Sequence, residues 1–383
     1  VPAIQTFAVN KVSQKLSEQW GSEISLKDIM VTPTLKIVAH DFRIADHHNN
    51  DMIFVGDIKG RLLSVKLNPM KLKFGKVELG NANIVLRTYE GEDVINIARW
   101  AKNLQKKNNQ PFVLDGEHVL LSDSRFVLIN DNSRVVYDTK GHPDIDYSYL
   151  EFKDINWDIK PFKLRGDNVS ADFQEMSFSQ YGGFTMNSGS GQFNICDTSM
   201  TFRNFKARTD RSNLDLDLKF SYPTWATYGE FLDSVLITAS IRPTVLAMGD
   251  VACWAPAIKG MEDVFTIQSD RVQGYVNDFS LINLRARWGL SALLAGDFSF
   301  KDITDFWNAQ ISAQIDSASC NIPELVSFTL PNGKHITLPS TVQKIGNVNL
   351  DGSFVGTPGN FYTKLNAATS LGGLIADLRT LPS

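Results

Sequence analysis

The stretch 213–220 alternates strictly between polar and apolar side chains. Its apolar side chains are those of Leu214, Leu216, Leu218 and Phe220. Successive side chains of a strand point to opposite faces, so this stretch predicts a sheet with one apolar and one polar face. A parallel sheet covered on both faces would show continuous apolar runs instead. Most of the chain repeats the alternation, which predicts a mainly β fold built as an elongated, curled antiparallel sheet that forms a groove.

Composition limits the partners that such a sheet serves. The 383 residues suffice for two or three domains or for one extended sheet. The 24 phenylalanines outnumber the 7 tryptophans and 9 tyrosines, and aromatic enrichment favours strands. A formal charge of −4 gives no case for nucleic acid, which requires a strongly basic face.

Helical spacing marks two segments in the first part of the chain. Residues 1–20 place Ile4, Phe7 and Leu16 on one face, and Gly21 is positioned to end the helix. Residues 92–107 show the same spacing. The first segment predicts an amphipathic helix that packs on the sheet or closes its end. The alternative is the continuation of a removed membrane anchor, lying near the bilayer surface.

Alternating segments predict the strands. In the first part these are 23–31, 35–44, 53–63, 74–79 and 83–88, with a turn or bulge at Gly80-Asn81. Further strands are predicted at 119–121, 124–129, 134–138, 149–159, 169–178, 191–195, 200–209 and 214–222. Short helices are predicted at 243–254, 302–307 and 323–328.

The order of these segments predicts three parts. Residues 1–108 would form the helix and a first β unit, and 109–240 a β meander. Residues 241–383 would form repeated β units with short helices that continue beyond the sequence. The repeat is weak: Gly274 leads to Phe279, and Gly352 leads to Phe361, each before a second strand. Hairpins that recur at intervals of roughly 80 residues indicate an architecture that extends by adding units.

Catalytic and metal-binding patterns are missing from the sequence. It contains no Gly-x-Ser-x-Gly, no Walker motif and no dinucleotide-binding glycine motif, so we expect neither an enzyme nor a cofactor. Only His40, His47 and His48 cluster, beside several aspartates, and their spacing matches no zinc pattern. We therefore interpret this segment as an exposed polar loop and predict no metal site.

Three cysteines, Cys196, Cys253 and Cys320, lie far apart in the sequence. Their spacing excludes a disulfide framework and favours small buried apolar side chains, although one disulfide stays possible.

The order of several short motifs carries a resemblance to a known family. The motifs are the helix end Gln14–Gln19, Glu23–Ile29, Phe42–Asp46, Ile53–Ile58, Lys76–Leu86 and Val94–Ile97. In this succession the chain resembles the N-terminal part of the AsmA-like proteins, in particular the TamB branch from Bacteroides-type bacteria. The resemblance is best over residues 1–105 and continues more loosely to the end.

Membership would imply a periplasmic protein anchored to the inner membrane through a segment upstream of this sequence. It would also imply a long curled sheet that carries phospholipid or another acyl lipid between the inner and outer membranes and supports outer-membrane biogenesis. Contact with outer-membrane assembly machinery would require a C-terminal domain. We expect both that domain and the anchor to lie outside this sequence.

An apolar groove suits an acyl chain for a simple physical reason. Each methylene gains about 0.8 kcal/mol on leaving water, so a tail of about fifteen methylenes gains roughly 12 kcal/mol from an apolar lining. The lining needs apolar side chains at every second position and no specific constellation. The candidate lining residues are Phe193, Ile195, Leu214, Leu216, Leu218, Phe220, Phe298, Phe300, Phe354 and Leu365.

Alternatives remain for both the residues and the function. Each lining candidate also fits an ordinary core between two sheets. A non-enzymatic scaffold for outer-membrane protein assembly, which pairs a client strand with an open sheet edge, is the second functional hypothesis. A β-rich adhesin or carbohydrate-binding module is the third.

Overall fold

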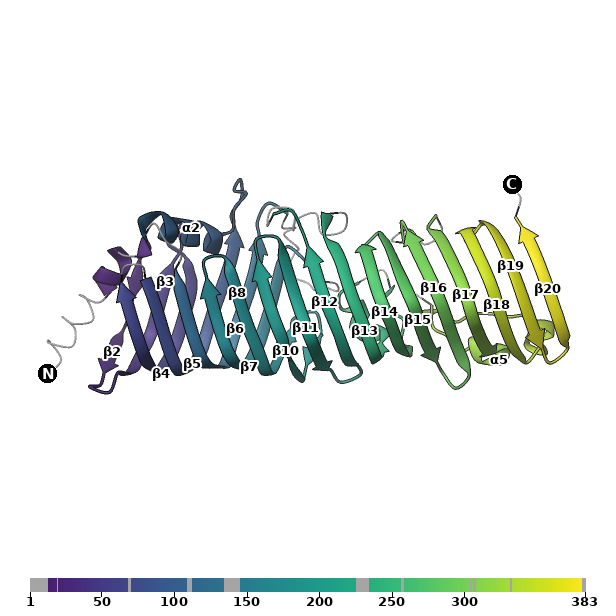
Figure 1. The fold of residues 1–383 in the computed structure, drawn as a ribbon, viewed down its shortest axis with the longest axis horizontal. Coiled ribbons are helices and arrows are strands. Elements are labelled where there is room, and N and C mark those ends of the chain that lie inside the picture. The colour runs from purple at the N-terminus through teal and green to yellow at the C-terminus, as the bar shows by residue number, and fades with distance from the viewer. Residues whose placement is uncertain are drawn as a thin grey trace. The chain divides into compact units, whose positions relative to one another are not determined.

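The computed structural model describes residues 13–18, 20–67, 70–108, 112–133, 145–224, 234–255, 258–303, 305, 308–330 and 333–380. The chain is mainly β, as predicted, and divides into two compact units, Val1–Asp197 (unit 1) and Thr198–Ser383 (unit 2) (Figure 1). The predicted strand 134–138 and most of the predicted helix 1–20 lie outside the described residues. The division into three parts at 108 and 240 stays a prediction, although strand β13 (Leu236–Ala247) runs through residue 240.

Unit 1 is one hydrogen-bonded sheet with a helix between two of its strands. Its elements are β1 (Ile24–Ser25), β2 (Asp28–Val31), β3 (Lys36–Ala45), β4 (Asp51–Leu67), β5 (Met70–Thr88), α2 (Asn96–Asn108), β6 (Val113–Asn130), β7 (Tyr149–Arg165), β8 (Asn168–Gln180), β9 (Thr185–Met186) and β10 (Ser188–Cys196). β1 and β2 pair with β3, the strands from β3 to β8 follow in chain order, and β9 and β10 pair with β8.

One pair in unit 1 corrects the expectation of a purely antiparallel sheet. β5 and β6 run parallel, with Lys71 opposite Val113 and Thr88 opposite Asn130. Parallel neighbours require a crossover of a dozen or more residues, and the segment that contains α2 supplies it.

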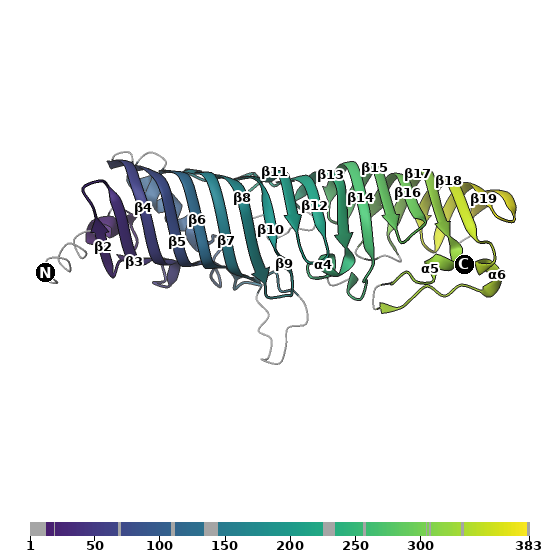
Figure 2. The same ribbon diagram turned by 90° about the horizontal axis from the view of Figure 1, so that it is seen from below.

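Unit 2 is an antiparallel meander in which each strand pairs with the next one along the chain. Its strands are β11 (Ser199–Arg208), β12 (Asn213–Ser221), β13, β14 (Val264–Tyr275), β15 (Asp278–Trp288), β16 (Ala292–Lys301), β17 (Gln310–Asn321), β18 (Asn347–Thr357), β19 (Asn360–Thr369) and β20 (Gly372–Arg379). Its helices are α4 (Met248–Ala252), α5 (Ile322–Leu325) and α6 (Ser340–Gln343). In Figure 2, α5 and α6 lie below the strands from β16 to β19.

The helix predicted over 243–254 is wrong in its first half. Residues 243–247 complete β13, where Thr244 lies opposite Ile267 and Leu246 opposite Phe265 of β14. Only residues from Met248 to Ala252 are helical. The short helix predicted near 323–328 is confirmed as α5.

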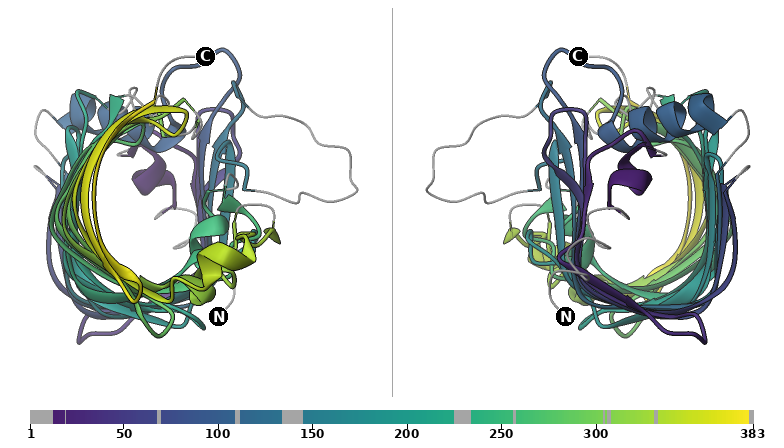
Figure 3. Two further views of the ribbon diagram at one scale, coloured as in Figure 1. Left: turned by 90° about the vertical axis from the view of Figure 1, so that its right-hand side faces the viewer. Right: turned by 90° about the vertical axis from the view of Figure 1, so that its left-hand side faces the viewer.

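Each unit's sheet curls, and its apolar face lies on the concave side. In unit 1 the helical residues near Trp20 lie inside the curve of the strands (Figure 3) and pack on Ile24 and Ile44. In unit 2, α5 lies toward the open side of the curve, and the following Phe328 packs on Phe265 and Trp288. A curled sheet with an apolar concave face is therefore shown for each unit by itself.

Bulges bend the strands at positions where Asn or Asp takes a left-handed backbone conformation. Asp123 in β6 and Asn283 in β15 have φ of 49° and 50°, and the pairing register shifts at both positions. Short polar side chains tolerate this conformation, and a bulge adds local bend and twist to its strand. Asn81 in β5 also has a positive φ, 53°, but the pairing of β5 with β4 and with β6 keeps its register there, so the turn or bulge predicted at Gly80-Asn81 is wrong and the two strands predicted around it are one continuous strand, β5.

Glycines on the concave face of unit 2 contribute further curvature. Gly274 and Gly356, with φ of 140° and 136°, lie opposite Phe279 and Phe361. Each glycine is followed at the fifth position by that phenylalanine, so the structure aligns Gly356, not Gly352, with Gly274 in the repeat. Such glycine kinks curve a sheet, and the opposing aromatic ring fills the space that the missing side chain leaves.

Candidate apolar binding face and cavity

Rows of apolar side chains cross the strands of unit 2. Residues directly opposite each other on antiparallel strands point to the same face. One such row crosses all ten strands and consists of Phe202, Leu218, Ala239, Val272, Leu281, Phe298, Ala313, Phe354, Thr363 and Leu378. Its one polar member is Thr363, whose hydroxyl group donates a hydrogen bond to the carbonyl oxygen of Ser353 at 2.8 Å. The row is a continuous apolar surface across unit 2.

Neighbouring rows extend this surface along the strands. A second row consists of Met200, Phe220, Ile237, Gly274, Phe279, Phe300, Ile311, Gly356 and Phe361. A third row consists of Ile267, Ala286, Leu294, Ala318, Leu350, Ala367 and Leu374. Rings stack along the second row, with centroids 5.2 Å apart for Phe279 and Phe300.

Eight of the predicted lining residues belong to unit 2 and share this concave face. Leu218, Phe298 and Phe354 lie in the first row, and Phe220 and Phe300 lie in the second. The other three alternate with them along the same strands: Leu214 and Leu216 in β12, and Leu365 in β19. Most are partly exposed, and Phe298 is buried with 7% exposure.

The other two candidates, Phe193 and Ile195, lie on the concave face of unit 1. Ile195 lies opposite Val169, whose row continues through Leu164 and Leu114. Leu164 and Leu114 pack with the buried Phe112 and with Trp100 of α2. The structure therefore places all ten candidates on apolar concave faces, divided between the two units.

Two helical segments cover part of the concave face in unit 1. The rings of Trp20 and Trp100 pack edge to face, with ring centroids 5.9 Å apart and planes at 65°. Both side chains pack on Phe112, as do those of the strand residues Leu72 and Leu114. Gly21, with φ of 67°, ends the first segment as predicted, since its N–H donates to the carbonyl of Ser17. This part of the face is a closed core.

In unit 2 a short segment, residues 322–329, lies over the concave face, and we call it the strap. Glu324 of the strap accepts hydrogen bonds from the backbone N–H groups of Leu290 and Ser291 and from the Ser291 hydroxyl. These bonds hold the pKa of Glu324 below its usual value. The strap is thus tied to the turn between β15 and β16.

Asp263 fixes the other end of the strap. Its carboxylate accepts hydrogen bonds from the indole N–H of Trp288 at 2.7 Å and from the backbone N–H of Thr329 at 2.8 Å. Phe328 packs edge-on against Trp288, with centroids 5.2 Å apart and planes at 77°. The strap therefore meets the sheet through an aromatic contact and two polar ties.

Between strap and sheet lies an apolar cavity of about 260 Å³. Its lining includes Phe265, Trp288, Leu294, Cys320, Leu325, Phe328 and Leu350. Burial raises the pKa of the Cys320 thiol, which disfavours a reactive thiolate there. All three cysteines are free in the structure. An apolar cavity of this kind accommodates hydrocarbon and offers almost no hydrogen-bonding partners.

Sequence reasoning identified the face but missed the cavity. None of its lining residues belongs to the predicted set, because the cavity depends on a loop segment that lies over strands from β14 to β18. The available signal was Phe328 at the end of a predicted helical turn, a large apolar side chain outside any alternating segment.

The opposite face of unit 2 is polar and internally paired. Arg242 of β13 forms ion pairs with Asp215 and with Asp217, the latter at 2.8 Å. Partial desolvation raises the pKa of Asp217, but the hydrogen bonds from Arg242 and from the backbone N–H of Asn204 outweigh it and leave the pKa lowered. These ion pairs link β12 to β13 on the polar face.

The fold and this face define a class: a curled, single-layer β-sheet protein with an apolar concave lining. No protein-family model, curated protein or solved structure matches the chain. Among the described helices, none combines the length and apolar character needed to cross a membrane.

Proposed function

We propose that the protein holds the acyl chains of phospholipid, or of a similar lipid, against the apolar concave faces of its curled sheets. As a member of the AsmA-like type, it would act in the periplasm, anchored to the inner membrane, as a segment of a lipid conduit toward the outer membrane. The observation that carries the proposal is the apolar row that crosses all ten strands of unit 2.

Two further observations support the proposal that the concave face of unit 2 binds an apolar ligand and is not a closed core. No second sheet packs on the described strands of unit 2, which all belong to one meander. The cavity under the strap is open, and its almost entirely apolar surface includes Leu294, Ala318 and Leu350 of the third row. About ten sheltered methylenes would gain roughly 8 kcal/mol, which is enough to hold a lipid without polar contacts.

The decisive experiment measures lipid uptake by a variant with a charged lining. We expect delipidated protein to take up fluorescent phospholipid, and Leu216→Asp with Leu218→Asp to abolish uptake, because two carboxylates would interrupt adjacent positions of the lining. Native mass spectrometry should detect phospholipid that co-purifies with the unaltered protein and is lost from the double variant.

A matched control places two carboxylates on the other face of unit 2. Gln273 and Ser299 are exposed there, so Gln273→Asp with Ser299→Asp adds the same charge without touching the lining. Circular dichroism would establish whether both double variants fold. Unchanged uptake in a folded Leu216/Leu218 variant would refute lipid binding at this face.

Strand pairing at a sheet edge is the second candidate function. Among the described strands, β20 pairs with β19 and ends the sheet of unit 2, and its Leu374 and Ile375 are 60% and 85% exposed. An exposed apolar edge strand is a template for another strand. A client peptide that binds β20 without displacing lipid would favour this assembly role, and a peptide that shows no binding would remove it.

A further inference from the structure

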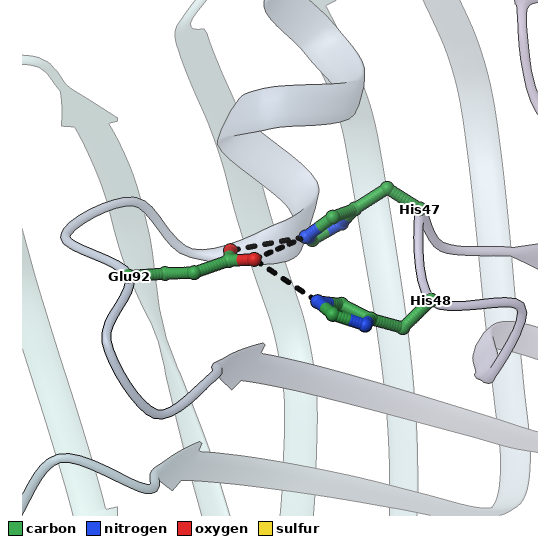
Figure 4. Close-up of side chains that lie close together, drawn as sticks. All are labelled: His47, His48 and Glu92. Carbon is green, nitrogen blue, oxygen red and sulfur yellow. Dashed lines mark hydrogen bonds and ion pairs between the residues drawn. The ribbon is translucent and has the colours of Figure 1, made fainter.

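Two histidines and a glutamate from separate loops meet at one point in unit 1 (Figure 4). Nε2 of His47 and Nε2 of His48 each lie 3.0 Å from Oε1 of Glu92. Their ligand atoms all fall within 4.8 Å of one another. The histidines follow β3 and the glutamate follows β5, so 44 residues separate His48 from Glu92 in the sequence.

The surroundings hold these three side chains in place. Asp46 is 7% exposed and accepts hydrogen bonds from the backbone N–H groups of His48 and Asn50, which fixes the histidine loop. The ring of Tyr89 packs on that of His48, with centroids 4.0 Å apart. The site is therefore positioned by a buried carboxylate and an aromatic ring, rather than by solvent-exposed contacts alone.

Arg99 of α2 also contacts the glutamate. Its Nη2 lies 2.9 Å from Oε2 of Glu92, an oxygen that Nε2 of His47 also approaches at 3.0 Å, whereas Oε1 is the atom within 3.0 Å of both imidazoles. Metal-binding carboxylates are commonly held in this way by a hydrogen bond to the oxygen that does not bind the ion. The glutamate side chain is 19% exposed and those of the histidines 24% and 46%, which leaves access for an ion and a water molecule.

We propose that His47, His48 and Glu92 bind one divalent transition-metal ion, with zinc as the best fit. Two imidazoles and one carboxylate form a recognised zinc ligand set, with water at the fourth position. Tetrahedral zinc with bonds of about 2.0–2.1 Å places neighbouring ligand atoms about 3.3 Å apart. The two imidazole–carboxylate separations of 3.0 Å are close to this value, and all three ligand atoms lie within 4.8 Å of one another, so small side-chain rotations complete the geometry. The ion would link the turn after β3 to the loop that leads into α2.

This site revises the interpretation of the histidine cluster as only an exposed polar loop. The sequence showed His47 and His48 but gave no reason to select Glu92, because the third ligand comes from a different loop. The lack of a zinc-binding motif concerned only residues that are close in the sequence. In the folded chain Glu92 lies beside the two histidines.

The test is zinc binding to the full chain by isothermal titration calorimetry after treatment with a chelator. We expect one zinc ion per chain, and a loss of affinity of at least tenfold in His48→Gln and in Glu92→Gln. The matched control is His40→Gln, which removes a histidine of the same unit that also faces two carboxylates, Asp28 and Asp57. His40→Gln should bind zinc like the unaltered chain.

A second measurement requires no substitution. Cobalt bound to the unaltered chain should show the intense visible absorption of a four-coordinate ion with nitrogen and oxygen ligands. The proposal is overturned if the unaltered chain binds no zinc, or if affinity falls equally in His40→Gln and His48→Gln. A cobalt spectrum typical of six-coordinate, water-bound ions would also overturn it.

Discussion

Single residues on the concave face determine how tightly the sheet of unit 2 curls. Gly352 has φ of 147° and lies opposite Leu365. A Cβ atom added to it would lie 2.0 Å from the carbonyl oxygen of Lys364 on the neighbouring strand. No side chain fits there unless β18 and β19 move apart, so the backbone at this point requires glycine.

We expect Gly352→Ala to lower the free energy of unfolding by about 2 kcal/mol, because it combines a strained φ with a clash against backbone. Urea unfolding followed by circular dichroism measures the change. Gly359→Ala is the matched control, since nothing lies within 4 Å of a Cβ at this hairpin glycine. Equal losses in the two variants would contradict the assignment of Gly352 to the curl.

The paired carboxylates on the polar face make unit 2 sensitive to acid. The pKa of Asp217 is lowered from its ordinary value of 3.8, because hydrogen bonds from Arg242 and Asn204 outweigh partial desolvation. A carboxyl group with a depressed folded-state pKa stabilises the fold above its unfolded-state pKa. That contribution is lost as pH falls through the lower, folded-state value.

We therefore expect Asp217→Asn to be less stable than the unaltered chain near neutral pH, and the difference to shrink as pH falls below about 4. Thermal unfolding measured between neutral and acidic pH tests this. Asp167→Asn, at an exposed turn, should leave the profile unchanged. A difference between Asp217→Asn and the unaltered chain that grows in acid would show that the sign is wrong.

At the scale of elements, local alternation predicts that a strand exists better than it predicts where the strand begins and ends. The hairpins of unit 2 are confirmed because each strand keeps its two-residue period between turn residues, as in β11 and β12. At Asp123 a polar residue of the kind that makes turns instead makes a bulge inside a long strand, and Asn81 adopts the same left-handed conformation within a strand whose pairing is continuous. Turn and bulge share the left-handed conformation, so sequence alone does not separate them.

Pairing with distant strands explains the remaining errors. Residues 243–247 fit helical spacing as well as strand spacing, and their ladder with β14 decides for the strand. The parallel pair of β5 and β6 likewise depends on where the chain returns after α2, which no local pattern encodes. Propensity and period are weak where long-range hydrogen bonds compete with them.

The strap is an element whose attachment can be tested through the free thiol beneath it. Glu324→Ala removes the bonds to Leu290 and Ser291, so we expect the strap to open more often and Cys320 to react several-fold faster with a maleimide. Loss of the Glu324 charge should also speed the reaction. Burial and the negative charge of Glu324 both raise the pKa of Cys320, so removing the charge favours the reactive thiolate.

Glu324→Gln separates the two causes, since it removes the charge and keeps one acceptor oxygen. Cys196→Ser and Cys253→Ser provide the background, and Ser340→Ala on the exposed helix α6 is the control. Equal reaction rates in Glu324→Ala and the unaltered chain would show that these bonds do not retain the strap. Added phospholipid should slow the reaction in every variant.

At the scale of the whole molecule, the candidate face was predictable and the cavity was not. The ten lining candidates share concave faces because a strand preserves its period of two, which the sequence displays directly. The cavity combines residues from Phe265 to Leu350 through the strap, and the histidine cluster combines loops 44 residues apart. Sites formed by segments that only the fold brings together leave no mark in a local pattern.

Both units present an apolar face, so lipid should contact residues in each of them. We expect a photo-reactive phenylalanine analogue at Phe193 in unit 1 and at Phe354 in unit 2 to cross-link labelled phospholipid, because both rings lie in apolar rows. The same analogue at Gln192 and Lys364, exposed residues directly beside such rows on the opposite face, should capture little. Capture from unit 2 alone would restrict the binding face to that unit. Equal capture from both faces would show that lipid adheres to the surface without selecting the concave side, and the apolar rows would then be only a structural lining.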